Sequence, residues 1–151
     1  MDDQPPRPVP TDVTRPFWDG LAADQVRLQR CAGCAAWVFY PRPRCSTCLS
    51  DALEWHTVSG HGAVYSYTVA RQATHPAFAA DVPQLLAIVE LDEGVRVTTT
   101  MVDVEPDDLR IGLPVAPVFD HGDDGMTLLR FRPSTDDARP VALSGGAAGA
   151  G

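Results

Sequence analysis

Cys31-Ala-Gly-Cys34 and Cys45-Ser-Thr-Cys48 decide the fold of the first half of this 151-residue chain. They contain all four of its cysteines, arranged as two CxxC pairs. A CxxC turn points two thiolates at one centre, and two such turns surround a Zn²⁺ ion with a tetrahedron of sulfur. Gly33 and the Pro41-Arg-Pro43 approach to the second pair supply the turn chemistry that such a site needs. The pattern predicts a zinc ribbon whose ligands are Cys31, Cys34, Cys45 and Cys48.

Three other uses of the cysteines stay open at this point. Two disulfides need an oxidising compartment, but the N-terminus (Met-Asp-Asp-Gln-Pro-Pro) lacks the basic and apolar regions of a signal peptide. A redox CxxC explains one pair and leaves the other idle. Iron in a rubredoxin-like cage is chemically allowed and would make the protein an electron carrier. We favour structural zinc, because a closed four-sulfur site has no open position for substrate.

The composition of the chain limits the cellular compartment and the kinds of partner that we expect. The formal net charge of −8 argues against binding to a phosphate backbone, so we expect no nucleic acid partner. No apolar run approaches the roughly 20 residues of a membrane span, and we therefore expect a cytoplasmic protein. All 12 basic residues are arginine, so no side chain can form a Schiff base with a carbonyl substrate.

Composition and pattern divide the chain into five segments. They are a proline-rich flexible arm (1–13), a short helix (14–25), the zinc ribbon (26–58), an OB-fold (59–133) and a disordered tail rich in Gly and Ala (134–151). Thr14 is expected to cap the helix. One face of this helix carries Phe17, Trp18 and Leu21, which we expect to be buried in the chain's own core or against a partner.

Alternating apolar residues and turn signals predict strands over most of the remaining chain. The ribbon strands are expected at Val26–Arg30, Trp37–Tyr40 and Leu53–Val58, and the barrel strands at Ala63–Arg71, Leu85–Leu91, Val95–Val102, Val115–Asp120 and Met126–Arg132. Glu105–Leu109 reads as one helical turn between the third and fourth barrel strands, which is the layout of an OB-fold. The predicted fold class is mainly β, with an N-terminal helix, a rubredoxin-like zinc ribbon and a C-terminal five-stranded OB-fold barrel.

The order and spacing of several segments resemble a known family. These segments are Phe17–Leu21, Leu28–Cys34, Pro41–Cys48, Leu53–Trp55, Gly60–Val69, His75–Phe78, Val89–Gly94 and Arg110–Val115. The chain is similar to the zinc-ribbon OB-fold proteins of domain-of-unknown-function family thirty-five, also called acyl-CoA-associated OB-fold proteins. The resemblance implies a partner subunit that is thiolase-like or lipid-transfer-protein-like, as in steroid side-chain aldolases, with acyl-CoA at the interface. It transfers no catalytic residue to this chain.

Two groups of residues are candidates for a ligand or partner surface. His75 and Phe78 lie in the first long loop of the barrel, which helps to form the binding face in OB-folds. His75 can donate a hydrogen bond to a thioester, or it can shape the loop while Phe78 fills a gap in the core. Tyr65 and Tyr67 share one face of the first barrel strand, and Arg71 extends that line. The arginines that can meet CoA phosphates are Arg71, Arg96, Arg130 and Arg132.

The sequence offers no constellation of catalytic groups. It lacks a GxSxG motif, a Gly-rich phosphate loop and an HExxH motif, and its paired carboxylates lie in predicted turns. Zinc would also engage every cysteine. The favoured function is a non-catalytic accessory subunit of a thiolase-like acyl-CoA enzyme, which helps to form its acyl-CoA channel. The alternatives are a single-stranded nucleic-acid-binding OB-fold protein and an iron-containing electron carrier.

Overall fold

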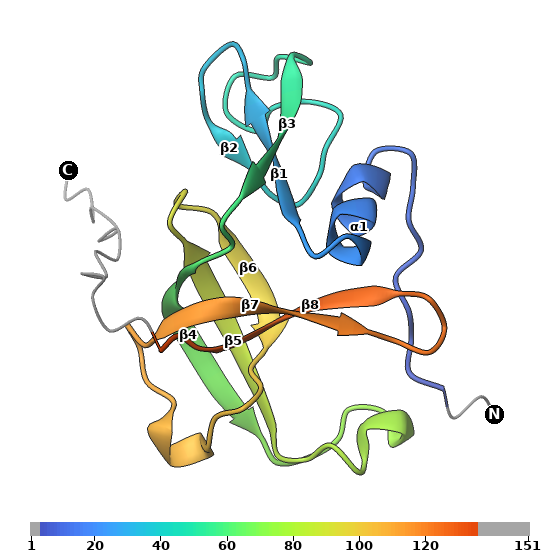
Figure 1. The fold of residues 1–151 in the computed structure, drawn as a ribbon, viewed down its shortest axis with the longest axis vertical. Helices are drawn as coiled ribbons and strands as arrows, with labels where there is room; N and C mark the ends of the chain where they lie inside the picture. The colour runs from blue at the N-terminus through green and yellow to red at the C-terminus, as the bar shows by residue number, and fades with distance from the viewer. Residues whose placement is uncertain (1–3, 136–151) are drawn as a thin grey trace.

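The computed structural model describes residues 4–135 and confirms a mainly β fold with one N-terminal helix (Figure 1). The helix is α1 (Arg15–Ala22), and the ribbon strands are β1 (Val26–Cys31), β2 (Trp37–Val38) and β3 (Leu53–Val58). The barrel strands are β4 (Gly62–Ala70), β5 (Gln84–Leu91), β6 (Arg96–Thr100), β7 (Pro114–His121) and β8 (Thr127–Pro133). Short 3₁₀ turns occupy Pro76–Phe78 and Pro106–Asp108. No described helix is long and apolar enough to cross a membrane.

The ribbon is a three-stranded antiparallel sheet with β1 in the middle. Gln29 on β1 lies opposite Val38 on one side and Trp55 on the other. In Figure 1 the ribbon stands above the barrel, and α1 lies beside it. Strand β1 runs from Val26 and Leu28, which are buried in the barrel core, to Cys31 at its other end, in a separate cluster.

The OB-fold barrel is a five-stranded sheet in the order β6-β5-β4-β7-β8. A β-bulge at Tyr65 bends β4, since the register with β5 shifts between Val64 and Ser66. The two edge strands, β6 and β8, approach each other and meet at a parallel bridge between Met101 and Phe131. The sheet thereby curls into a barrel whose seam is closed at this end.

Two apolar clusters of very different size hold these parts together. The larger one runs through the barrel and also takes in Val26 and Leu28 from β1. The smaller one contains Cys31, Val38 and Cys45 at the metal end of the ribbon. Strand β1 therefore contributes to both cores.

The structure differs from the sequence-based expectations at several points. Thr14 does not cap α1: its backbone is helical, and its hydroxyl accepts a hydrogen bond from the Thr11 amide at 2.8 Å. β2 ends at Val38, two residues earlier than expected. Arg7, in the arm predicted to be flexible, places its Nε 2.8 Å from a carboxylate oxygen of Asp124. The predicted disordered tail lies outside the described residues from position 136 onward.

Candidate functional site

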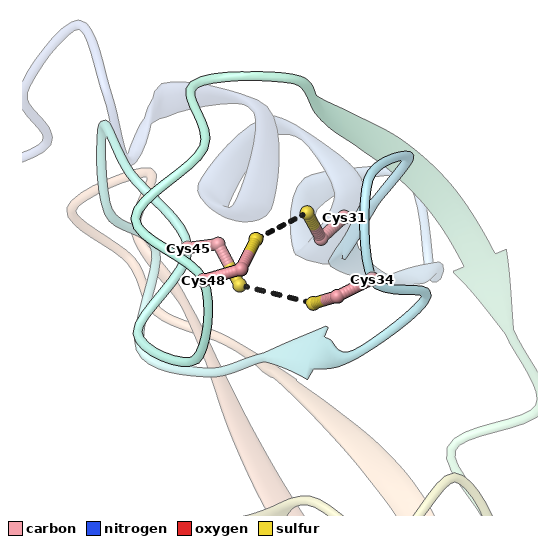
Figure 2. Close-up of side chains that lie close together, drawn as sticks. All are labelled: Cys31, Cys34, Cys45 and Cys48. Atoms are coloured by element: carbon pink, nitrogen blue, oxygen red, sulfur yellow. Dashed lines mark hydrogen bonds between the residues drawn. The ribbon is translucent and has the colours of Figure 1, made fainter.

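The four cysteine sulfurs converge on one point between the two knuckles (Figure 2). The Sγ atoms of Cys31 and Cys48 are 3.5 Å apart, those of Cys34 and Cys45 are 3.6 Å apart, and all four lie within 4.8 Å of one another. A tetrahedral zinc with Zn–S bonds of about 2.3 Å places its sulfurs about 3.8 Å apart. The cage thus has the donor set and the size for one Zn²⁺, which confirms the predicted structural zinc.

The two knuckles are built alike, although their sequences differ. The Ala35 amide donates to the Cys31 carbonyl at 2.8 Å, and the Leu49 amide donates to the Cys45 carbonyl at 3.0 Å. Ala35 and Leu49 both adopt a left-handed backbone, with φ of 61° and 63°. Each chain reversal therefore ends on a residue other than glycine, at some local cost in conformational energy. Residue type alone gave no sign of this.

Without a metal, the thiols of Cys34 and Cys45 differ widely in pKa. Hydrogen bonds from the backbone amides of Cys48 and Thr47 lower the pKa of Cys45 to about 6. The Ala36 amide also lowers the pKa of Cys34, but burial and the neighbouring thiols outweigh it and raise that pKa to about 12. A divalent cation removes this conflict, because it stabilises thiolates that otherwise repel one another. The four sulfurs are therefore arranged in favour of a bound cation.

A buried glutamine braces the approach to the second knuckle. Gln29 is 5% exposed, and its Nε2 donates to the Arg42 carbonyl at 3.0 Å. Its Oε1 accepts from the Arg42 amide at 2.9 Å. This pair of bonds ties the central ribbon strand to the loop that carries Cys45. Sequence reasoning missed it, because Gln29 falls in the polar phase of the alternation that starts at Val26, where an exposed side chain is expected.

The aromatic residues of α1 join a ring cluster. Phe17 is buried, and its ring centroid lies 5.1 Å from that of Trp18, 5.7 Å from Phe39 and 6.1 Å from Tyr40. Trp18 is half-buried. Phe39 and Tyr40 leave the ribbon sheet after Val38 to reach this cluster. The sequence pattern did not indicate that these two rings meet α1.

The His75 loop shows local contacts. His75 accepts a hydrogen bond at Nδ1 from the Ala77 amide at 3.1 Å, so it caps the 3₁₀ turn Pro76–Phe78. Its ring centroid lies 6.2 Å from that of Phe78. Both side chains are half-buried. These contacts shape the loop and leave a ligand role for His75 and Phe78 as a prediction.

Tyr65 and Tyr67 have different neighbours in the structure, and Arg71 lies beyond the end of β4. The guanidinium of Arg96 lies over the Tyr65 ring, 3.7 Å from its centroid. Tyr67 is 40% exposed and borders a separate groove, which it shares with Leu86. Arg71 is exposed and follows the last residue of β4. The bulge at Tyr65 accounts for the difference between Tyr65 and Tyr67, because it interrupts the alternation of faces between them. A shared ligand or partner surface for Tyr65, Tyr67 and Arg71 stays a prediction.

A histidine links two distant segments near the tip of the β7–β8 hairpin. His121 Nε2 lies 2.7 Å from the Asp24 carboxylate, and its Nδ1 lies 3.0 Å from the Thr127 hydroxyl. The connectivity is that of a hydroxyl–imidazole–carboxylate triad. Thr127, however, is only 4% exposed, so its hydroxyl does not face a substrate. The three residues form a structural clasp between the end of α1 and the hairpin.

Comparisons with known proteins agree with this architecture. The model of a rubredoxin-like zinc ribbon domain of ChsH2 matches residues 18–54. The model of the C-terminal OB-fold domain of ChsH2 matches residues 55–120. Together the two models cover more than half of the chain and meet within β3, the last ribbon strand.

Two curated relatives belong to different kinds of protein. A probable enoyl-CoA hydratase alpha subunit of Thermomonospora curvata is 43% identical over 133 residues, which cover 85% of this chain. This chain spans only 40% of the length of that relative. A DUF35 domain-containing scaffold protein of Methanocaldococcus jannaschii is 37% identical over 108 residues, which cover 68% of this chain and 76% of the relative.

A solved structure described as the Ltp2-ChsH2(DUF35) aldolase contains a similar chain. The two share 36% sequence identity and superimpose with a TM-score of 0.75. The match covers 84% of this chain and 98% of the other. The ribbon, the cysteine cage, the barrel and these likenesses together show that the chain belongs to the DUF35 family of zinc-ribbon OB-fold proteins, with domains of the ChsH2 type.

Proposed function

We propose that this chain is a non-catalytic accessory subunit of a thiolase-like enzyme that acts on acyl-CoA thioesters. The observation that carries the proposal is its likeness to nearly the whole length of a chain in an aldolase named for Ltp2 and ChsH2. The scaffold name of the Methanocaldococcus jannaschii relative points in the same direction. A steroid side chain as the substrate group is the finer part of the proposal and follows from the family resemblance.

The chemistry of the described residues supports a role without catalysis. A zinc ion in the cysteine cage has four sulfur ligands and no open position for water or substrate. The Thr127 hydroxyl is buried, and His75 is engaged by the Ala77 amide. The partner therefore supplies the nucleophile and the acid–base groups.

The exposed side of β4 and the loop that follows it are the proposed partner surface. Tyr67 is exposed there, and Arg71 lies at the start of the loop. An aromatic side chain suits a protein interface, and a guanidinium binds phosphate through paired donors. We assign Arg71 to the CoA phosphates and Tyr67 to the partner enzyme. The complex belongs in the cytoplasm, where cysteines stay reduced and available to zinc.

The proposal is tested by purifying the zinc-loaded chain from its native host under mild conditions. Mass spectrometry is expected to identify a stoichiometric thiolase-like or lipid-transfer-protein-like subunit. The two chains are then assayed separately and together for cleavage of an acyl-CoA aldol adduct. We expect turnover by the complex and none by this chain alone. Turnover by this chain alone, or recovery without such a partner, would contradict an accessory role.

Matched variants locate the partner surface. Tyr67→Ala is expected to weaken co-purification with the partner, whereas Ile111→Ala is the control. Ile111 is also exposed but follows the 3₁₀ turn Pro106–Asp108 and not β4. Arg71→Gln is expected to raise the KM for acyl-CoA in the complex while leaving the complex intact. Equal effects of Tyr67→Ala and Ile111→Ala would place the interface elsewhere.

A further inference from the structure

The two knuckles of the ribbon share an arginine as well as a pair of cysteines. The pattern Arg-Cys-x-x-Cys-x occurs twice, at residues 30–35 and 44–49. In both copies the arginine directly precedes the first cysteine, and the last residue directly follows the second. That last residue, Ala35 or Leu49, is the one with a left-handed backbone. The repeat therefore places Arg30 and Arg44 at equivalent positions beside the metal cage.

Each arginine donates a hydrogen bond to the residue that ends its own knuckle. Arg30 Nε donates to the Ala35 carbonyl at 3.2 Å, and Arg44 Nη1 donates to the Leu49 carbonyl, also at 3.2 Å. The amides of Ala35 and Leu49 already donate to the carbonyl of the first cysteine in each pair. Both polar backbone groups of the left-handed residue are thus bonded, which offsets the cost of that conformation. The arginine closes the turn that positions two of the sulfurs.

Neither of these arginines is neutralised by a carboxylate. Within residues 4–135, every ion pair of an arginine lies outside the ribbon, and those arginines are Arg7, Arg15, Arg96 and Arg130. The sequence between Asp24 and Asp51 contains four arginines and no acidic residue, although the whole chain has a net charge of −8. The cage therefore lies in a locally basic segment of an acidic protein.

A bound zinc ion gives this positive charge a partner. Four thiolates around one Zn²⁺ leave the cage with a net charge of −2. The guanidinium groups of Arg30 and Arg44 together carry the opposite charge, and each is held at the residue next to a cysteine ligand. Arg30 is also held from a second side, because its guanidinium lies 5.1 Å from the centroid of the Trp37 ring. Fixed guanidinium groups attract an anion with less loss of freedom than mobile ones.

We infer that Arg30 and Arg44 are positioning residues of the zinc site, with two roles. Each guanidinium fixes the carbonyl that ends its knuckle, and the two charges together stabilise the dianionic zinc–thiolate unit. The inference concerns how this chain holds its metal. It therefore goes beyond the accessory role and does not depend on the identity of the partner.

The test measures the zinc affinity of the full chain by competition with a chelating dye. Arg30→Gln and Arg44→Gln each remove a charge and a carbonyl bond, and each is expected to lower the affinity about tenfold, since groups that support metal ligands typically contribute 10–100-fold. Arg42→Gln is the matched control. Arg42 is exposed in the same loop, and the bonds described for it are made by its backbone. We expect its affinity to stay within about twofold of the wild type.

Two further measurements separate the charge from a purely structural role. Arg30→Lys and Arg44→Lys keep the charge and should recover part of the affinity that the glutamine variants lose at low salt. The difference between wild type and the glutamine variants should also shrink at high salt, because salt screens the attraction between guanidinium and cage. A bond to the carbonyl alone would give neither result.

Circular dichroism at saturating zinc establishes that each variant is folded. Zinc affinity at the wild-type value in both glutamine variants would overturn the inference. An equal loss in Arg42→Gln would overturn it as well, because the effect would then follow the charge of the segment and not the two arginines held at the knuckles. A loss that is the same at low and high salt, with no recovery by lysine, would refute the electrostatic role.

Discussion

The two ends of β1 lie in cores of different kinds. Val26 and Leu28, near its start, are buried in the apolar cluster that fills the barrel. Cys31, at its end, is buried with Val38 and Cys45 in a much smaller cluster. The barrel end can fold by burying apolar surface, at roughly 1.5–3 kcal/mol for each large side chain. The metal end has too few such side chains and depends on zinc, which can contribute on the order of 10 kcal/mol.

The largest expected effect comes from breaking the metal end. Cys31→Ser removes one of four ligands, so we expect loss of bound zinc and of the order in both knuckles. The barrel should stay folded, because Val26 and Leu28 remain in its core. Zinc analysis together with hydrogen exchange checks this: protection should disappear around β2 and persist in β4–β8.

A neighbouring substitution is the control for the Cys31 variant. Ser46→Ala changes an exposed residue between the two cysteines of the second knuckle and should leave zinc content at the wild-type value. Stoichiometric zinc in Cys31→Ser would show that the cage is not a four-cysteine site.

A core substitution in the barrel should lower the stability of the protein without affecting zinc binding. Phe131 is fully buried, and Phe131→Ala is expected to lower the free energy of unfolding by about 3–5 kcal/mol. Urea denaturation measures the loss. The protein that remains folded should bind zinc as before, since the cage lies in the other cluster. Phe119→Ala, at a half-buried position of β7, is the control and should cost less.

The space around two glycines differs between the barrel end and the metal end of the molecule. A Cβ atom at Gly62 would overlap the Glu90 carbonyl oxygen, whereas one at Gly33 would lie 3.5 Å from Cys31 Sγ, an ordinary contact. Gly62→Ala is expected to destabilise the protein by about 1–3 kcal/mol. Gly33→Ala should change stability by less than about 0.5 kcal/mol. Thermal denaturation of both variants decides, and equal shifts in Tm would refute the difference in packing.

The smallest expected effect concerns the brace between the two ends. Gln29→Met keeps the size of the side chain but removes both hydrogen bonds to Arg42, at a cost of about 1 kcal/mol. Zinc affinity, measured by competition with a chelating dye, should fall about fivefold. Gln25→Met is the matched control, because Gln25 is exposed and its side chain bonds only to Arg27 among the contacts described. An unchanged zinc affinity in Gln29→Met would show that the hydrogen bonds between Gln29 and Arg42 do not support the metal site.

Local signals in the sequence were enough for much of the fold. Leu53–Val58 alternates and forms β3 with the expected bounds. The cysteine spacing predicted the cage because each pair needs only its own turn to aim two sulfurs. The third barrel strand, expected at Val95–Val102, is shorter: β6 ends at Thr100, and Met101 pairs with Phe131 of the opposite edge strand instead.

Features that depend on contacts between residues far apart in the chain could not be predicted from local sequence patterns. β2 is short because Phe39 and Tyr40 pack against Phe17 instead of continuing the strand. His121 and Asp24 form their contact across 97 positions of the chain. Neither pairing follows from a local pattern, because each exists only once the helix, ribbon and barrel are assembled. The same holds for the cleft lined by Phe17, Tyr40 and Leu129, whose walls come from separate parts of the sequence.

Because β1 contributes to both the barrel core and the metal site, the two parts are expected to evolve differently. Positions in the barrel core can change one at a time through apolar residues of similar volume. The cage cannot change one residue at a time, since the loss of any one cysteine abolishes the four-ligand site. The remaining cysteines then include at least one buried thiol, Cys31 or Cys45, without a metal. Descendants of this chain are therefore expected to keep all four cysteines or to lose all four. Those that lose them should carry apolar side chains at positions 31 and 45, converting a metal-held tip into an ordinary small core.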